Sequence, residues 1–289
     1  MAVSRAVLIT GCSTGIGRAT AGRLASRGWK VYAPARDVGK VEDLADRGCE
    51  LLPLDVTDEA SMRAAVEEVE RREGAVGVLV NNAGYSQSGP VEGVSIEKVR
   101  RQFETNVFGL VRMCQLVLPG MRRQGWGRIV NISSMGGRLT FPGGGYYHAT
   151  KYAVESISDA LRFEVAGFGV EVVVLEPGLI RTGFADAATG SMAGASGDLG
   201  DAPAGDPYAG FNAAVEKVVR DNYERGLILK LGGGPGTVAT TIERAITADR
   251  PRTRYAVTPS AHLFIWLRRL LPDRAWDALA RTVYPQPGR

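Results

Sequence analysis

The chain has 289 residues, of which 45% are hydrophobic and 23% charged, and its formal net charge is +4. These values are ordinary for a globular protein and exclude both a disordered chain and a mini-protein that depends on disulfides. Three cysteines at no metal-ligand spacing and two histidines argue against a disulfide framework and a zinc site, so no metal is expected. A surplus of four charges among 35 basic and 31 acidic residues gives little reason to expect a nucleic-acid partner.

The N-terminal segment does not read as a signal peptide, because its apolar run, Ala6–Ile9, is too short for one. No uninterrupted apolar stretch approaches the roughly 18 residues of a membrane span. We therefore expect a cytoplasmic protein without a transmembrane segment.

Short β-branched runs alternate with longer helical patterns as far as Pro177, and no linker or repeat interrupts them. This alternation is typical of βαβ units around a parallel sheet. Two helices are predicted at Arg18–Arg27 and at Asp58–Glu73, the second with Asp58 as its N-cap. Several strands are apolar on consecutive positions, as expected when helices cover both faces of the sheet. The pattern predicts one doubly wound α/β domain over residues 1–289, with strands at Ala6–Thr10, Lys30–Ala35, Glu50–Asp55, Val78–Asn82, Arg128–Ser133 and Val170–Glu176.

The composition changes after Pro177, where Gly183–Gly210 is rich in Ala, Gly, Asp and Ser and has little apolar periodicity. A loop of this length is usually functional or disordered, and a lid over a site is the functional version. We therefore predict a substrate-binding loop over about 183–225. A second glycine cluster, Gly232–Gly236, lacks the Lys-Ser/Thr of a phosphate loop and is interpreted as the entry turn of a helix over Thr237–Ala248.

A glycine-rich turn follows the first predicted strand and runs into a helical pattern. Glycines allow the backbone to approach a pyrophosphate, and the helix N-terminus offers it unpaired N–H groups and a positive dipole. The glycine spacing is four then two, unlike the common dinucleotide fingerprint. The turn nevertheless predicts a dinucleotide site formed by Gly11, Ser13, Thr14, Gly15, Ile16 and Gly17.

The end of the second strand distinguishes NAD from NADP, because an acid there binds the ribose 2′-hydroxyl and a base favours a 2′-phosphate. Asp37 lies about 20 residues after the glycines, as a ribose-binding acid should, but Arg36 precedes it. The two could equally form a solvated surface pair. We predict NADP(H) as the favoured cofactor, with NAD(H) as the alternative.

Several motifs occur in one order and together resemble the short-chain dehydrogenase/reductase family, over roughly the first 185 residues. They are the glycine turn, the Asn-Asn-Ala-Gly sequence at 81–84, Thr105–Gly109, Ile129–Ser134, the Tyr-x-x-x-Lys at 147–151 and the Pro-Gly-x-x-x-Thr at 177–182. The resemblance implies a Rossmann-type sheet of seven parallel strands, with cofactor contacts at Asp55, Val56, Asn82, Ala83, Gly84, Pro177, Gly178, Ile180 and Thr182.

The resemblance also implies four catalytic residues, Asn106, Ser134, Tyr147 and Lys151. Tyr147, unlike Tyr146, precedes Lys151 by four residues, and residues at this spacing share one helix face. Ser134 lies thirteen residues before Tyr147, as is usual in the family, and Ser133 remains the alternative.

Reduction of a ketone by a hydride leaves an alkoxide that must gain a proton. A tyrosine titrates near about 10, so it needs a neighbouring cation to act at neutral pH. We predict that Tyr147 is the general acid/base, that Lys151 stabilises its phenolate and binds the nicotinamide ribose, and that Ser134 hydrogen-bonds the alkoxide. By resemblance, Asn106 would anchor a proton-relay water. His148 is interpreted as packing or pocket lining.

Substrate recognition is expected in the loop Gly136–Gly145, in the span after Gly183 and in a C-terminal extension over about 250–289. Candidate pocket walls are Phe141, Phe184, Tyr208 and Phe211, each of which could instead pack in the core. The extension contains Ser260–Leu271, an apolar face with basic flanks that could cover the pocket, contact a membrane surface, mediate self-association or pack on the domain.

With a last strand at Arg254–Val257, the extension resembles that of the steroid- and retinol-dehydrogenase-like branch of the family. This implies an oxidoreductase for an apolar alcohol or ketone, steroid-, retinoid- or polyketide-like, and the family suggests a homodimer or homotetramer. The alternative function is a catalytically silent NAD(P)-binding sensor.

Overall fold

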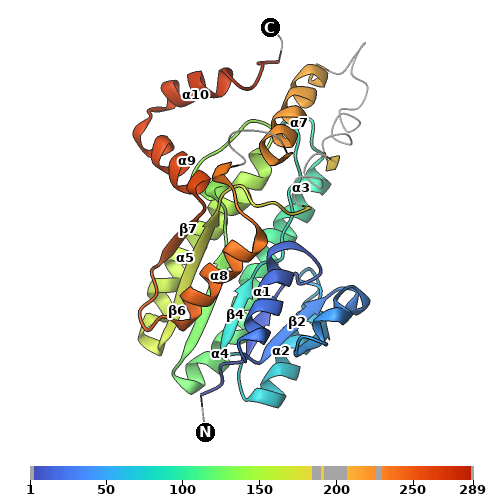
Figure 1. The fold of residues 1–289 in the computed structure, drawn as a ribbon, viewed down its shortest axis with the longest axis vertical. Coiled ribbons are helices and arrows are strands. Elements are labelled where there is room, and N and C mark those ends of the chain that lie inside the picture. The colour runs from blue at the N-terminus through green and yellow to red at the C-terminus, as the bar shows by residue number, and fades with distance from the viewer. Residues whose placement is uncertain (1–2, 184–189, 192–206, 225–229, 288–289) are drawn as a thin grey trace.

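The computed structural model describes residues 3–183, 190–191, 207–224 and 230–287. Within them, seven strands form one sheet in the order β3-β2-β1-β4-β5-β6-β7 (Figure 1), and all six neighbouring pairs are parallel. The predicted doubly wound α/β fold is confirmed, and each predicted strand lies within two residues of the observed one. The strands are β1 (Val7–Ile9), β2 (Val31–Ala35), β3 (Cys49–Pro53), β4 (Val78–Asn81), β5 (Gly127–Ile132), β6 (Val170–Pro177) and β7 (Arg254–Val257).

Helices cover both faces of the sheet and divide the core into two layers. Val7 and Ile9 point to the layer under α1 (Gly15–Ser26) and α8 (Pro235–Thr247), whereas Leu8 points to the layer under α2 (Glu59–Glu73), α4 (Gly109–Gln124) and α5 (Gly145–Val165). Because successive strand residues face opposite sides, both sides must be apolar. This explains the consecutive apolar runs in the sequence.

Two helix starts show how local sequence sets the boundaries. Asp58 caps α2 as predicted, since its Oδ1 accepts hydrogen bonds from the N–H groups of Ala60 (2.9 Å) and Ser61 (3.3 Å). Helix α1 begins at Gly15, three residues before the predicted Arg18, so the glycine turn contributes its first turn. The shorter helices are η1 (Val38–Leu44), α3 (Ile96–Phe103), η2 (Glu104–Phe108), η3 (Met135–Gly137) and η4 (Ala166–Phe168).

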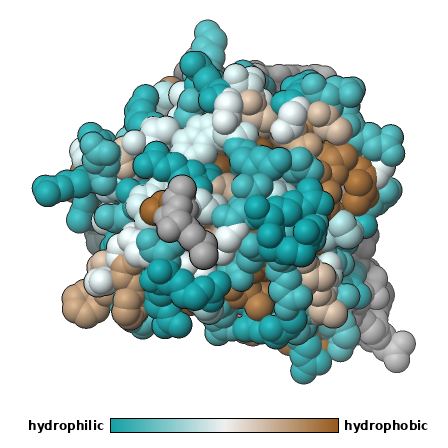
Figure 2. Space-filling view, turned by 90° about the horizontal axis from the view of Figure 1, so that it is seen from below, coloured by the Kyte–Doolittle hydropathy of each residue, from teal (hydrophilic) through white to brown (hydrophobic). Residues whose placement is uncertain are grey.

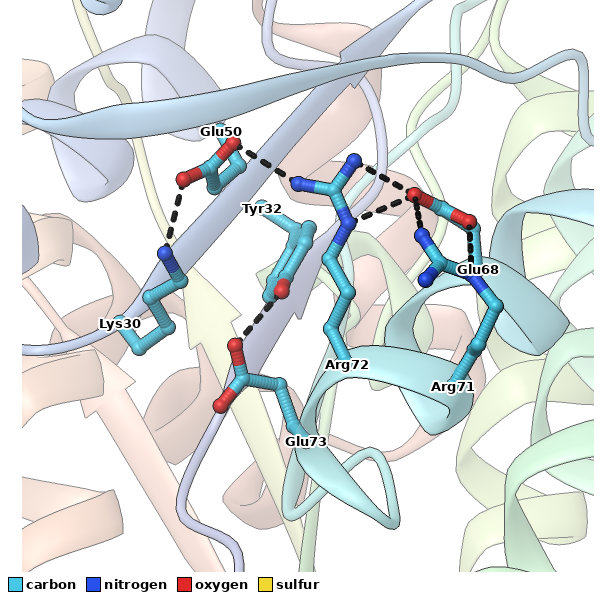
Figure 3. Close-up of polar contacts among 7 residues, drawn as sticks. All are labelled: Lys30, Tyr32, Glu50, Glu68, Arg71, Arg72 and Glu73. Carbon is cyan, nitrogen blue, oxygen red and sulfur yellow. Dashed lines mark hydrogen bonds and ion pairs between the residues drawn. The ribbon is translucent and has the colours of Figure 1, made fainter.

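A charged network fastens the end of α2 to the edge of the sheet (Figure 3). Glu50 on β3 accepts from Lys30 (2.7 Å) and Arg72 (3.1 Å), and the hydroxyl of the buried Tyr32 donates to Glu73 (2.7 Å). Exposed ion pairs of this kind contribute about 0–1 kcal/mol each. The network lies where β2 and β3 begin, at the opposite end of these strands from their carboxyl termini, so it supports the fold and not the site.

The C-terminal part of the chain adds α7 (Ala209–Glu224), α9 (Pro259–Leu270) and α10 (Asp273–Arg281), which gather at the end of the molecule away from the N-terminus (Figure 1). The structure differs from the predicted loop over 183–225, because its second half forms α7. One apolar face of this helix is formed by Val215, Val218 and Val219. The helical pattern was overlooked because the sequence before it is rich in glycine. Most of the predicted lid falls on 184–189 and 192–206, outside the described residues. Among the helices of the described residues, none has both the length and the apolarity needed to cross a membrane.

Candidate active site

A cavity of about 1300 Å³ opens at the carboxyl ends of the strands, where the strand order reverses between β1 and β4. Ligands bind at such switch points in doubly wound folds. Every predicted site residue except Gly17 and Asn106 lines this cavity, including Ser134, Tyr147 and Lys151.

The glycine turn is held by close approaches that exclude side chains. A Cβ at Gly17 would lie 2.3 Å from the carbonyl oxygen of Gly11, and Gly11 and Gly15 have φ of +74° and +58°. Thr14, at the N-cap of α1, makes no side-chain hydrogen bond to the helix, which leaves N–H groups of the first turn free. The cradle therefore suits the pyrophosphate of a dinucleotide.

Thr10 fastens the glycine turn to the end of β4, a role that the sequence analysis missed. Its Oγ1 accepts from the backbone N–H of Asn82 and of Ala83, both at 3.0 Å, and the Asn82 amide donates to the Thr10 (2.9 Å) and Gly11 (3.1 Å) carbonyls. The two predicted cofactor segments are thus one hydrogen-bonded unit.

Asn106 lies in a π-helical turn, η2, between α3 and α4, and such turns are frequent at functional sites. Its Oδ1 accepts from Tyr85 N (3.0 Å), and its Nδ2 donates to Tyr85 O (2.9 Å) and Thr150 Oγ1 (3.1 Å). The buried side chain therefore joins the segment after β4 to α5. Both amide hydrogens of Asn106 are engaged by these bonds.

Tyr147 and Lys151 occupy one face of α5, as the spacing predicts. Lys151 Nζ lies 5.8 Å from the centroid of the Tyr147 ring and donates to the carbonyl of Ile132, at the end of β5, at 2.8 Å. Burial lowers the pKa of Lys151 to about 8, so the ammonium remains charged at neutral pH. A cation held this close favours the phenolate form of the tyrosine.

The two adjacent serines differ in environment. Ser134 is partly exposed, and its Oγ accepts from the N–H of Gly136 at 3.0 Å. Ser133 is buried, and its Oγ has no hydrogen-bond partner among the described residues; a Cβ on Gly137 would lie 2.6 Å from it. Both serines line the cavity, and of the two only Ser134 is partly exposed, which favours Ser134 as the serine that a substrate oxygen can reach.

Three comparisons with known proteins point to one family. A family model described as short chain dehydrogenase matches residues 5–192. The NADPH-dependent 3-dehydrocapnine reductase of Ornithobacterium rhinotracheale is 35% identical over 284 residues, 95% of each chain. Retinol dehydrogenase 16 of Rattus norvegicus is 34% identical over 294 residues, 97% of this chain and 89% of that one. A solved short-chain dehydrogenase from Streptomyces avermitilis has a TM-score of 0.76 and 33% identity, covering 98% and 99% of the two chains.

The chain belongs to the short-chain dehydrogenase/reductase family. The resemblance drawn from the motifs is confirmed, and relatives include a retinol dehydrogenase. As a short-chain dehydrogenase/reductase, the protein is an oxidoreductase that acts on an alcohol or ketone with NAD(P).

In this short-chain dehydrogenase/reductase, the two residues that could select the cofactor, Arg36 and Asp37, have different surroundings. Arg36 lines the cavity, whereas Asp37 is not among the lining residues and caps η1, its Oδ1 accepting from Gly39 N at 3.1 Å. Asp55 also lines the cavity, with its Oδ1 engaged by the N–H (2.9 Å) and hydroxyl (2.8 Å) of Thr57.

The Pro-Gly turn after β6 rests on the junction between β7 and α9. A Cβ at Gly178 would lie 2.4 Å from Ser260 Oγ and 2.5 Å from Thr258 Oγ1, and Ser260 Oγ accepts from Leu179 N at 3.1 Å. Thr258 has φ of +97°, a conformation that costs about 1–3 kcal/mol for a residue with a side chain. Neither Thr258 nor Ser260 belongs to a recognisable sequence motif, because each touches the site only through the turn.

Two buried carboxylates of this short-chain dehydrogenase/reductase share Arg254, and the first of them, Glu155, lies one helical turn after Lys151; neither was predicted. Glu155 contacts Arg254 (2.9 Å) and Glu176 contacts Arg254 (3.5 Å) and Arg138 (3.6 Å). Burial, and then the charge of Glu155, raises the pKa of Glu176 to about 7. Glu155 also opposes the loss of the proton from Lys151 that burial promotes.

His148 packs between Tyr147 and the apolar end of the cavity, in agreement with its interpretation as a lining residue. Its ring meets Tyr147 edge-on at 5.6 Å and Phe141 at 6.1 Å. Nδ1 lies 3.1 Å from the carbonyl of Gly136, which can only accept, so Nδ1 carries the hydrogen. Burial lowers the pKa of His148 to about 4, which keeps the ring neutral.

The far end of the cavity is apolar. Phe141 packs against Phe264 (5.6 Å between ring centroids) and Trp276 (5.9 Å). Tyr208 and Phe211 do not line the cavity, and Phe184 lies outside the described residues. The remaining apolar wall comes from α7 and from α10 and the residues after it, namely Val215, Val218, Val219, Leu279, Ala280, Val283 and Tyr284.

Proposed function

We propose that this protein is an NADP(H)-preferring oxidoreductase that interconverts a bulky apolar alcohol and its ketone or aldehyde, with Tyr147 as general acid/base. The observation that carries the proposal is the placement of Tyr147, Lys151 and Ser134 on one cavity wall that is continuous with the glycine cradle.

The residues of the cradle fit a nicotinamide dinucleotide. The free N–H groups of the first turn of α1 suit its phosphates, and Gly17 and Gly11 provide the close approach that the phosphates need. Thr182 lies beside the cradle, since a Cβ on Gly15 would be 3.4 Å from its Cγ2. When bound there, the nicotinamide would supply or accept the hydride.

The proton is handled by the chain itself. In the direction of ketone reduction, Tyr147 donates its hydroxyl proton to the developing alkoxide, and Lys151 stabilises the phenolate left behind. Ser134 donates a hydrogen bond to the same oxygen as its charge grows. Oxidation of the alcohol follows the reverse path.

Preference for NADP(H) is supported by the different positions of Arg36 and Asp37 at the end of β2. Arg36 is directed to the cavity and can pair with a 2′-phosphate, while Asp37 is committed to capping η1. Asp37 is therefore not placed to accept from the ribose 2′-hydroxyl. The name of the O. rhinotracheale relative records dependence on NADPH for that enzyme.

An apolar substrate is supported by the aromatic and aliphatic wall of α7 and α10. The cavity of about 1300 Å³ exceeds the roughly 300–1,000 Å³ of pockets for one small ligand, which leaves space for a substrate beside the dinucleotide. The retinol dehydrogenase relative is named for an apolar alcohol.

The test is oxidation of NADPH and of NADH, side by side, over ketones from small diketones to steroids. We expect turnover with NADPH on the large apolar ketones. Tight NADPH binding without turnover on any ketone would instead support the silent sensor.

Two further parts of the proposal concern the state of the protein. Exposed aromatic side chains on α5 and at the start of α4, Phe163, Tyr152 and Phe108, support a homodimer or homotetramer. Light scattering of the purified chain gives its mass directly.

The three cysteines are free and buried, which suits the reducing cytoplasm.

A further inference from the structure

Helix α9 carries an apolar strip that the fold does not use. Leu263, Trp266 and Leu270 recur three and four residues apart on one side, and Trp266 and Leu270 are 57% and 59% exposed. The opposite side of the helix packs into the domain through Phe264 and Ile265. Helix α9 is therefore apolar on both sides, and only one side is covered within the described residues.

The helix that carries the strip and the helix that follows it are net basic, because α9 and α10 contain Arg268, Arg269, Arg274 and Arg281 against Asp273 and Asp277. Residues 250–289 contain eight arginines and two aspartates, a net charge of +6, so the preceding 249 residues carry a net −2. Arg269 lies one turn after Trp266 and is exposed, and no ion pair to it is found among the described residues. By contrast, the face at the N-terminal end of the molecule is dominated by hydrophilic side chains (Figure 2).

The strip lies next to the apolar end of the cavity. Helix α10 follows α9 directly, and its Trp276 faces inward, while Leu279 and the nearby Val283 line the cavity and are themselves partly exposed. Helix α9 itself reaches the cavity through Phe264, on the side opposite the strip, so the helix that exposes Trp266 also borders the apolar end of the cavity.

We propose that the strip of Leu263, Trp266 and Leu270, with Arg269 beside it, docks the protein on the surface of a bilayer that contains anionic lipids. Tryptophan is favoured at the headgroup level and leucines reach the acyl boundary, while arginine extends to the lipid phosphates. A second copy of the chain fits less well, because a two-fold contact through α9 would bring two net basic helix pairs together. Docking does not require turnover, so it is tested independently of the proposed reaction.

The experiment is sedimentation of the full-length protein with phosphatidylcholine vesicles, with and without phosphatidylglycerol, in the absence of cofactor and substrate. We expect the protein to pellet with the anionic vesicles and to be released by salt. Arg269→Glu should lower the partition coefficient roughly 25-fold, about fivefold for each unit of charge. Trp266→Ser should lower it about tenfold by removing buried apolar area.

Matched controls lie at the other end of the molecule. Arg47→Glu makes the same charge reversal just before β3, and Phe168→Ser removes an exposed aromatic in η4, just after α5; both should bind vesicles as the wild type does. NADPH titration of each variant verifies folding, and if Trp266→Ser does not fold, Arg269→Glu decides alone. The proposal is overturned if the wild type stays in the supernatant with anionic vesicles, or if the α9 variants pellet as the wild type does. A change of oligomeric state in Trp266→Ser without vesicle binding would show that a second copy covers the strip.

Discussion

Lys151 holds its ammonium 5.8 Å from the centre of the Tyr147 ring while donating to the carbonyl of Ile132. The shared face of α5 sets the spacing of the two side chains, and the hydrogen bond to the end of β5 fixes the position of the ammonium group. Because the lysine is buried and its pKa is lowered to about 8, its charge is poorly screened by water and acts strongly on its neighbour. We infer that this cation is what allows Tyr147 to serve as the proposed general acid/base.

Cofactor choice should depend on Arg36 and not on Asp37. Arg36→Ala should raise the KM for NADPH roughly 10- to 100-fold, the range of a lost charge-assisted hydrogen bond, and leave the KM for NADH nearly unchanged. Asp37→Ala is the matched control, because it removes the cap of η1 at a cost of about 0.5–2 kcal/mol without altering the cofactor ratio. A reversed pattern, with Asp37→Ala altering the ratio, would assign the ribose to Asp37.

The glycine cradle should not tolerate a single methyl group at its tightest point. In Gly17→Ala, the new Cβ would meet the backbone carbonyl of Gly11, which cannot rotate away. We expect loss of NADPH binding and a fall of about 1–3 kcal/mol in the free energy of unfolding. Gly236→Ala, in the first turn of α8 with open space around it, is the control and should bind NADPH normally. Isothermal titration of both variants compares them, and equal affinities would contradict the cradle.

The carboxyl of Glu176 should make stability depend on pH. Its folded pKa of about 7 exceeds its ordinary value of 4.5, so between these pH values the folded state keeps a proton that the unfolded state has lost. Stability contributed by this group is therefore present below pH 4.5 and is lost as the pH rises through 7.

Glu176→Gln removes the titration, so the variant should gain stability relative to the wild type from pH 5 to pH 8. Urea unfolding of both proteins at the two pH values measures the difference. If the variant is instead less stable than the wild type at pH 8, the ion pairs with Arg254 and Arg138 outweigh the cost of burial.

The apolar wall should discriminate between substrates by size. Trp276→Ala removes the ring that packs on Phe141, and we expect the KM for a steroid-sized ketone to rise about tenfold while that for a small diketone changes little. Phe163→Ser, far from the cavity, should alter neither value. Equal effects on the large and the small ketone would mean that Trp276 supports the fold and does not form the pocket.

The fold was predictable because its signals are local. Consecutive apolar residues mark strands covered on both faces, Asp58 marks a helix start, and glycines mark the turn after β1. The spacing of Tyr147 and Lys151 also follows from helix geometry alone. Arg254–Val257, a short half-buried strand, was expected only by resemblance to the family.

The supporting residues of the site could not be read from the sequence, because their roles arise from contacts across long separations. Thr10 acts through residues 72 and 73 positions later, and Glu155 meets Arg254 across 99 positions. Thr258 and Ser260 matter only because Gly178 packs against them. Within the substrate-binding loop predicted over 183–225, helix α7 was not foreseen, because composition and not residue spacing dominated the interpretation.

The central claim is that Tyr147 carries the proton, and it is tested most directly by Tyr147→Phe, assayed with NADPH and a ketone that the wild type reduces. The ring and its packing on His148 remain, so NADPH affinity should stay within about twofold, while kcat falls at least about 100-fold, the lower range for loss of a general acid. A variant that binds NADPH and reduces the ketone at the wild-type rate would contradict the account.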